Sequence, residues 1–87
     1  MDLKIGTILT LEPTYTERVE KFRCRVVEQG ENIIYIDYPV NVITKKTSFL
    51  VDGAQFRVTF MTNEKQSFAF NTEVLGRKGG TVPMIIL

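Results

Sequence analysis

Residues 33–42 read Ile-Ile-Tyr-Ile-Asp-Tyr-Pro-Val-Asn-Val and open the most informative stretch of this chain. The stretch continues through Ile-Thr-Lys-Lys-Thr-Ser to Phe-Leu-Val-Asp-Gly-Ala-Gln-Phe-Arg-Val-Thr-Phe, which ends at residue 60. Two runs rich in β-branched and aromatic residues therefore flank a polar, proline-containing excursion. In the second run Phe56, Val58 and Phe60 alternate with other residues, which is the period of a strand with one buried face. The stretch predicts β-sheet.

The spacing of two recurs on both sides of this stretch, and turn-forming residues separate the runs at short intervals. Six strands are expected, at residues 4–12, 20–28, 33–37, 55–61, 67–76 and 81–87. Gly30 is expected to take a positive φ in the turn after the second strand, and Pro39 ends the third because proline cannot donate to the ladder. We expect an all-β fold, a six-stranded antiparallel split β-barrel, since open sheet edges would invite aggregation.

The inward positions of these strands define the expected core. Cys24 shares the register of Phe22 and Val26, which predicts a buried and unreactive thiol even though arginines flank it. The same alternation predicts that Val58 points inward and Arg57 outward. The core residues expected are Leu9, Leu11, Phe22, Val26, Ile34, Ile36, Phe56, Val58, Phe60, Phe68, Phe70, Val74 and Ile85.

The composition describes one small globular domain, because 44% hydrophobic and 24% charged residues are not typical of a disordered chain. A net charge of +1 provides no overall attraction to nucleic acid or to an anionic membrane. The chain has one cysteine and no histidine, so it lacks an internal disulfide and the commonest neutral-pH base and zinc ligand. Neither a signal peptide nor a membrane-spanning apolar run is recognisable, so the cytoplasm is the expected location.

Three sequence features could carry chemistry, and for each the structural interpretation is favoured. Lys21, Arg23 and Arg25 form a basic strand face, but no aromatic residue shares it as nucleic-acid stacking would require. The run Gly-Arg-Lys-Gly-Gly-Thr at 76–81 fits a hairpin turn better than a phosphate loop, because its lysine precedes the glycines and a strand follows. The carboxylates form no recognisable acid–base pair, so no enzymatic activity is expected. These carboxylates are Glu17, Glu20, Asp37, Asp52 and Glu73.

Two places remain as candidates for partner binding. The irregular connection at residues 38–48 is the longest in the chain and carries Lys45 and Lys46 at its tip. At the end of the chain, alternation leaves Met84 and Ile86 outward if Ile85 packs inward, and apolar side chains so placed need cover. Lys45, Lys46, Met84 and Ile86 are therefore the candidate partner surface. The fully apolar ending also suggests a chain cut at a domain boundary.

The order of these features resembles the amino-terminal domain of YcgR/YpfA-type flagellar brake proteins. The resemblance covers nearly the whole chain. The matching pieces are Lys-Ile-Gly-Thr-Ile-Leu at 4–9, Tyr-Pro-Val at 38–40, Asp-Gly at 52–53, Phe-Arg-Val-Thr-Phe at 56–60, Phe-Ala-Phe-Asn-Thr at 68–72 and Val-Pro-Met-Ile-Ile-Leu at 82–87.

In that family a split barrel precedes a PilZ domain that binds cyclic di-GMP. The PilZ ligand motif, Arg-x-x-x-Arg followed later by Asp/Asn-x-Ser-x-x-Gly, does not occur in this chain. The resemblance therefore implies that residues 1–87 are the non-enzymatic regulatory half and hold no cofactor, while cyclic di-GMP belongs to a PilZ domain beyond residue 87.

The resemblance implies a switch as the mechanism. Nucleotide binding in the PilZ domain would change the packing of the two domains and expose a surface that docks to a stator or rotor protein of the flagellar motor. The apolar terminal strand also predicts a homodimer of the isolated domain, whereas nucleic acid and membrane insertion are not expected. Two alternatives stay open: a small barrel that binds single-stranded nucleic acid, and a purely structural oligomerisation module.

Overall fold

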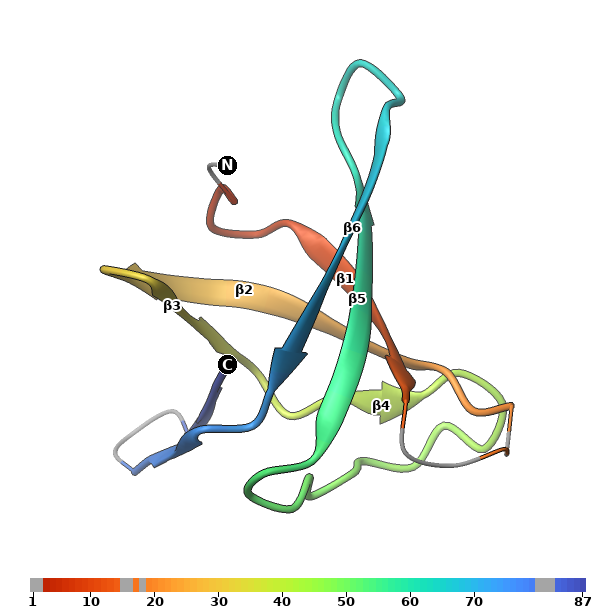
Figure 1. Ribbon diagram of the computed structural model, residues 1–87, viewed down its shortest axis with the longest axis vertical. Coiled ribbons are helices and arrows are strands. Elements are labelled where there is room, and N and C mark those ends of the chain that lie inside the picture. The colour runs from red at the N-terminus through yellow and green to blue at the C-terminus, as the bar shows by residue number, and fades with distance from the viewer. Residues whose placement is uncertain (1–2, 15–16, 18, 80–82) are drawn as a thin grey trace.

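The computed structural model describes residues 3–14, 17, 19–79 and 83–87 of the chain (Figure 1). Every regular element within these residues is a β-strand, and all paired strands run antiparallel. The strands are β1 (Ile8–Pro13), β2 (Phe22–Gly30), β3 (Ile33–Ile36), β4 (Val40–Asn41), β5 (Gln55–Met61), β6 (Ser67–Glu73), β7 (Gly76–Lys78) and β8 (Met84–Ile86).

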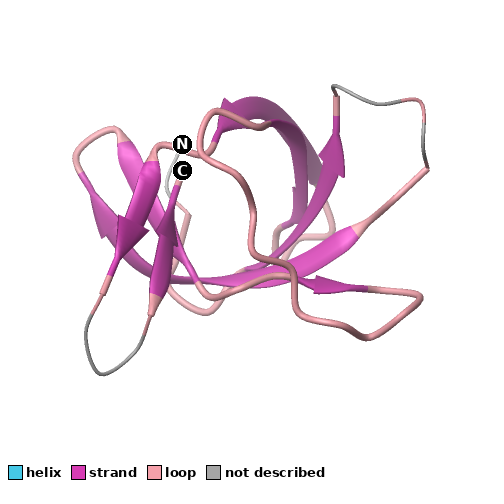
Figure 2. Ribbon diagram, turned by 90° about the horizontal axis from the view of Figure 1, so that it is seen from below, coloured by secondary structure: helices cyan, strands magenta, loops and turns pink. Residues whose placement is uncertain are grey.

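The strands form one strongly curled sheet in the order β6-β5-β1-β2-β3-β8-β7, with β4 attached to β2 (Figure 2). The long strand β2 belongs to both parts of the sheet, since its first half pairs with β1 and β4 and its second half pairs with β3. The register between β2 and β3 shifts between Val26 and Glu28, and such a bulge sharpens the bend of the strand. Because β6 and β7 lie at opposite ends of the order, pairing does not close the barrel. The expected all-β, antiparallel split barrel is confirmed.

The number of strands differs from the expected six because two segments expected to be turn or loop each contain a short strand, β4 within residues 38–48 and β7 at the start of the run 76–81. The predicted strand 67–76 ends at Glu73, because the chain changes its backbone hydrogen-bond partner directly after the buried residue Val74. The Val74 N–H donates to the Ala54 carbonyl, whereas the next N–H, that of Leu75, donates to the Ile86 carbonyl. The short strand β4 lies within the segment expected to be irregular. The chain therefore has eight strands in its described part.

Two turns also differ from expectation. Strand β1 starts at Ile8 instead of Lys4, because Gly6 adopts a φ of 93° in a turn before it. In the β2–β3 hairpin Asn32 takes the left-handed conformation, with a φ of 61°, and Gly30 does not. Asparagine tolerates this region better than most residues. Gly30 is needed for space instead, since an added Cβ would lie 2.9 Å from the Ile33 side chain.

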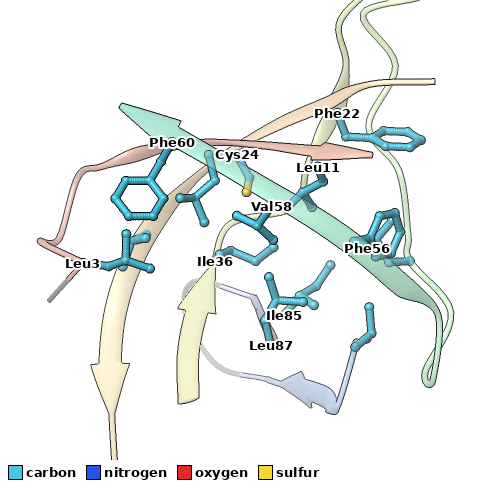
Figure 3. Close-up of a cluster of buried hydrophobic side chains, with 14 residues drawn as sticks. Leu3, Leu11, Phe22, Cys24, Ile36, Phe56, Val58, Phe60, Ile85 and Leu87 are labelled. Atoms are coloured by element: carbon cyan, nitrogen blue, oxygen red, sulfur yellow. The ribbon is translucent and has the colours of Figure 1, made fainter. Parts of the chain in front are cut away.

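The core lies between the two parts of the sheet (Figure 3), and its buried side chains come from five strands, β1, β2, β3, β5 and β8, and from the segments between and beside them. The Phe22 and Phe56 rings meet edge-on with centroids 6.3 Å apart. Val58 is fully buried and Arg57 is exposed, so the predicted register of β5 is confirmed. The buried set is Leu3, Leu9, Leu11, Phe22, Cys24, Val26, Ile36, Leu50, Phe56, Val58, Phe60, Val74, Ile85 and Leu87.

Three of the expected core residues lie at its edge. Ile34 and Phe70 are only half-buried, although both pack against the core. The prediction for Phe68 was wrong, since 40% of this residue is exposed; its ring stacks on that of its cross-strand partner Phe60, with 5.6 Å between centroids. Phe68 is near the start of β6, a strand that is paired on one side only, so no neighbouring strand covers it.

Candidate interaction surfaces

The last strand has the alternation that its apolar sequence requires. Ile85 and Leu87 are buried, and Leu87 exchanges two backbone hydrogen bonds with Ile34, at 3.1 and 2.9 Å. Met84 and Ile86 consequently face outward and are half-buried. Ile86 lies opposite Tyr35 of β3, so the outer surface here has an aromatic neighbour on the adjacent strand.

Strand β7 completes this outer surface with one long cationic side chain. Lys78 is paired with Met84 across the β7–β8 ladder, and its ammonium lies 5.3 Å from the centroid of the Tyr35 ring. The same ammonium is 3.8 Å from the Glu28 carboxylate. We call Tyr35, Lys78, Met84 and Ile86 the β8 face. It is an apolar strip bordered by an exposed ion pair, as is common at the rim of a protein interface.

The second candidate, the segment that follows β4, is an ordered turn. The Asn41 side-chain oxygen accepts hydrogen bonds from the N–H groups of Ile43 and Thr44, at 2.9 and 3.1 Å. Asn41 also receives the Lys45 N–H on its carbonyl and donates its own N–H to the Lys46 carbonyl. Lys45 has a φ of 64°, so the turn holds a lysine in the left-handed region. Both lysine side chains are exposed, as expected for the tip of a loop.

The apolar residues of this loop divide between the core and the surface. Leu50 is buried and belongs to the core cluster. Ile43, Phe49 and Val51 are between 68% and 79% exposed. The Phe49 ring has one partner that the structure records, Tyr38, which it meets edge-on at 5.3 Å between centroids. Exposed apolar side chains gathered on one loop are typical of a contact surface.

The structure does not bring the four candidate residues into one site. Lys45 and Lys46 follow β4, which is attached to the first half of β2, whereas Met84 and Ile86 lie on β8 beyond β3. Figure 1 shows the loop after β4 and the C-terminus on opposite sides of the molecule. Tyr35 and Lys78 were not predicted as members of this surface, because only the register of β3, β8 and β7 places them beside Met84 and Ile86.

Cys24 and Asp52, two titratable residues considered in the sequence, are a buried core residue and a member of an ion pair. Cys24 is buried, and burial, with a smaller contribution from the Asp37 charge, raises the pKa of its thiol from 9.0 to about 12. Asp52 forms an ion pair with Arg77 at 2.9 Å. Arg77 lies in β7, where it is paired with Ile85 of β8, and not in the turn in which it was expected. Residues 80 and 81 of the glycine-containing run 76–81, which was expected to be a hairpin turn, lie outside the described part.

The residues that the structure describes contain no group of three or more His, Cys, Asp or Glu side chains placed to hold a metal ion. In the same part of the chain there is also no helix long and apolar enough to cross a membrane.

The aromatic residues that a nucleic-acid site would need are engaged elsewhere. Tyr35 lies beneath Lys78, and Tyr38 packs against Phe49; both are half-buried. Tyr15 lies outside the described residues. The outer face of β2, with Lys21, Arg23 and Arg25, has Glu12 as an ion-pair partner of Lys21 at 3.9 Å.

Comparison with known proteins identifies the same fold in longer relatives. The solved structure of the Bacillus subtilis inhibitor of motility MotI/DgrA matches with a TM-score of 0.87 and 26% sequence identity, covering 98% of this chain and 41% of that one. A protein of Bacillus subtilis (strain 168) described as "Uncharacterized protein YpfA" is 26% identical over 85 residues, which is 98% of this chain and 39% of the relative. The chain thus spans about two fifths of the length of these relatives.

A family model provides the assignment. The model described as PilZNR, flagellar protein YcgR, matches residues 4–87, which is nearly the entire chain. The match agrees with the resemblance seen in the sequence and with the split-barrel architecture of the structure. The chain belongs to the PilZNR family of YcgR-type flagellar proteins.

Proposed function

We propose that this domain is the regulatory half of a cyclic di-GMP-responsive regulator of flagellar motility. The observation that carries the proposal is the match to an inhibitor of motility, with a TM-score of 0.87 over 98% of this chain. The likeness in fold comes with 26% identity and with a YcgR family match, so it is more than a shared small-barrel architecture. The domain acts by binding other proteins and not by catalysis.

Nucleotide recognition belongs to a second domain in this proposal. The Arg-x-x-x-Arg and Asp/Asn-x-Ser-x-x-Gly motifs of PilZ domains are missing from the 87 residues, so the charged pair that would clamp the phosphates is missing too. The two relatives are long enough to contain a further domain, since this chain covers 39% and 41% of them. We place cyclic di-GMP in a PilZ domain carried by the same polypeptide, in the cytoplasm.

The β8 face is the surface that we assign to the contact between the two domains. Met84 and Ile86 are outward-facing apolar side chains close to residue 87, and Tyr35 extends the same surface. A ligand shifts an equilibrium between two domain arrangements only if it binds one of them more tightly. Cyclic di-GMP would therefore favour an arrangement in which a docking surface for a stator or rotor protein of the motor becomes accessible.

Swimming speed tests the proposed function directly. The complete protein that contains this domain should slow swimming when it is produced in motile bacteria with raised cyclic di-GMP. Loss of the PilZ arginines should abolish the effect, because the nucleotide could no longer select the docking arrangement. Unchanged swimming, with the folded protein present at normal levels, would contradict the proposal.

The role of the β8 face is tested by scattering from the complete protein. Met84→Thr combined with Ile86→Thr should reduce the change in radius of gyration on adding cyclic di-GMP. The free energy of unfolding of the barrel should change by no more than about 1 kcal/mol, because both side chains face outward. Ile43→Thr, an exposed substitution on the far loop, is the control. The same nucleotide response in all three proteins would remove the β8 face from the mechanism.

A further inference from the structure

The edge of β2 beside β3 and β4 contains an interruption that opens a groove. Asp37 is hydrogen-bonded to Arg25, and Val40 is paired with Arg23. The chain between β3 and β4 therefore advances three residues, from 37 to 40, opposite an advance of two residues in β2. The Asp37 N–H donates to the Arg25 carbonyl at 3.2 Å. In return the Arg25 N–H donates to Asp37 Oδ1 at 2.7 Å, so a side-chain carboxylate replaces a strand carbonyl. On this side of β2 the ladder is interrupted between the pairs Val26–Ile36 and Arg23–Val40.

The groove beside this interruption has a volume of about 320 Å³. Cations line it from both sides, because Arg23 and Arg25 come from β2 and Lys45 from the turn after β4. Val40 and Val42 provide apolar wall between them. The Asn41-centred turn fixes the backbone of Lys45 at the rim of the groove.

The charge of this groove is not balanced from within the domain. Three ion pairs occur among the described residues, and they use Lys21, Arg77 and Lys78. No described carboxylate oxygen therefore lies within 4.0 Å of a charged nitrogen of Arg23, Arg25 or Lys45. Asp37 is the one acidic residue of the lining, and its Oδ1 already accepts the Arg25 amide. Three cations and one carboxylate leave a local charge of +2 in a chain whose net charge is +1.

We propose that this groove binds an acidic, extended segment of a partner protein. Carboxylates of the segment would pair with Arg23 and Arg25, whose planar guanidinium groups match carboxylates in two-point hydrogen bonds. Lys45 would contribute a third contact, and an aliphatic side chain would lie against Val40 and Val42. The inference rests on the proposed function, which requires a protein partner, and adds the chemistry by which that partner is recognised.

Charge complementarity favours a protein segment over nucleic acid. Single-stranded nucleic acids need aromatic platforms for their bases, and no aromatic residue lines this groove. The apolar wall made by Val40 and Val42 suits an aliphatic side chain better than a phosphate. An acidic sequence interrupted by leucine or valine is the occupant that uses every part of the lining.

Fluorescence anisotropy of a labelled peptide tests the groove with the 87-residue chain itself. The probe is fluorescein-Glu-Leu-Glu-Glu-Leu-Glu, and the same peptide with lysine in place of glutamate is its control. The acidic peptide should bind and the lysine peptide should not. Raising sodium chloride from about 50 to about 300 mM should weaken binding several-fold, since exposed charges are screened. Equal binding of the two peptides, or none of either, would overturn the inference.

Charge reversal locates the binding on the molecule. Arg23→Glu combined with Arg25→Glu should weaken the acidic peptide at least about tenfold and create binding of the lysine peptide. Both side chains are exposed, so the variant should remain folded, and its circular dichroism spectrum checks this. Lys4→Glu combined with Lys65→Glu makes the same charge change at other exposed positions and should leave acidic-peptide binding unchanged. Equal losses in both double variants would show that only overall charge matters.

Two further outcomes separate this inference from its rivals. An oligothymidylate of matched charge that binds more tightly than the acidic peptide would replace the protein partner with nucleic acid. Peptide binding without any effect of the complete protein on swimming would leave the groove in place and remove the motility function. Slowed swimming without peptide binding would support the motility function and remove the groove as a binding site for an acidic segment.

Discussion

At the scale of single residues, neighbouring positions on β5 differ sharply in environment. Val58 is fully buried among core side chains, whereas Arg57 is exposed and lies opposite Glu12 and Asn71 on adjacent strands. Alternation along a strand produces this contrast within one residue. It makes position 58 sensitive to charge and position 57 tolerant of it.

A pair of aspartate substitutions measures that difference. Val58→Asp places an unpaired carboxylate in the core and should cost more than about 3 kcal/mol, a large part of the stability of a small domain. Arg57→Asp should cost no more than about 1 kcal/mol, and that cost arises because Glu12 becomes a like-charged neighbour. Urea unfolding compares the two. Equal midpoints would show that the register of β5 is wrong.

Cys24 makes the stability of the domain depend on alkaline pH. Burial raises the pKa of its thiol to about 12 in the folded state, while the unfolded thiol keeps a pKa near 9.0. Because the pKa of the thiol is higher in the folded state, the stability that the protonated thiol contributes is complete below pH 9 and is lost as the pH rises toward 12. Between these values the unfolded state binds fewer protons, so stability should fall by up to about 1.4 kcal/mol per pH unit. Urea unfolding from pH 8 to pH 10.5 measures the slope.

The Cys24→Ala variant is the control for this slope. It removes the thiol and should lose stability with pH less steeply than the unsubstituted chain over the same range. Identical slopes for the two proteins would assign the pH dependence to other groups.

At the scale of elements, the glycine before β5 has a positive φ, whereas the glycine after β7 does not. Gly53 has a φ of 85° and donates its N–H to the Val74 carbonyl at 2.8 Å. This bond joins the start of β5 to the point at which the chain leaves β6 for β7. Gly79 has no positive φ, and an added Cβ at either glycine would meet nothing within 4 Å. Backbone conformation alone therefore distinguishes the two positions.

Alanine substitutions at these glycines test the turn before β5. Gly53→Ala should destabilise the domain by about 1–2 kcal/mol, because an L-residue is strained in the left-handed region. Gly79→Ala should be neutral, or stabilising by up to about 1 kcal/mol, since it restricts the unfolded chain without strain. Thermal melting is sufficient to compare them. A larger loss at Gly79 than at Gly53 would contradict the described turns.

At the scale of the whole molecule, the missing PilZ motifs predict that this domain alone does not bind cyclic di-GMP tightly. The 87-residue chain contains neither PilZ motif, so it should not bind cyclic di-GMP with a dissociation constant of about 1 μM or below. Isothermal titration calorimetry of the isolated chain measures this directly. Tight binding by these residues alone would place the nucleotide in the split barrel and would require a different mechanism for the switch.

The strand periods, the all-β class, the inward register of β5 and the burial of Cys24 were all predictable from the sequence. They depend on alternation and on turn chemistry, which are local properties of the chain. The family resemblance was also readable, because it rests on the order of short motifs. The same local rule required Met84 and Ile86 to face outward if Ile85 faces inward, and the structure has this arrangement.

Tertiary structure alone decided which strands are neighbours and therefore which side chains meet. The break at Val74 arises because the chain changes hydrogen-bond partner there, and no local propensity encodes that change. Phe68 is exposed because β6 has a partner on one side only. Lys45 lines the groove with Arg23 and Arg25 because β4 pairs with β2 and the turn centred on Asn41 follows β4 directly. Contacts between residues far apart in sequence depend on strand order and register, and alternation along one strand specifies neither.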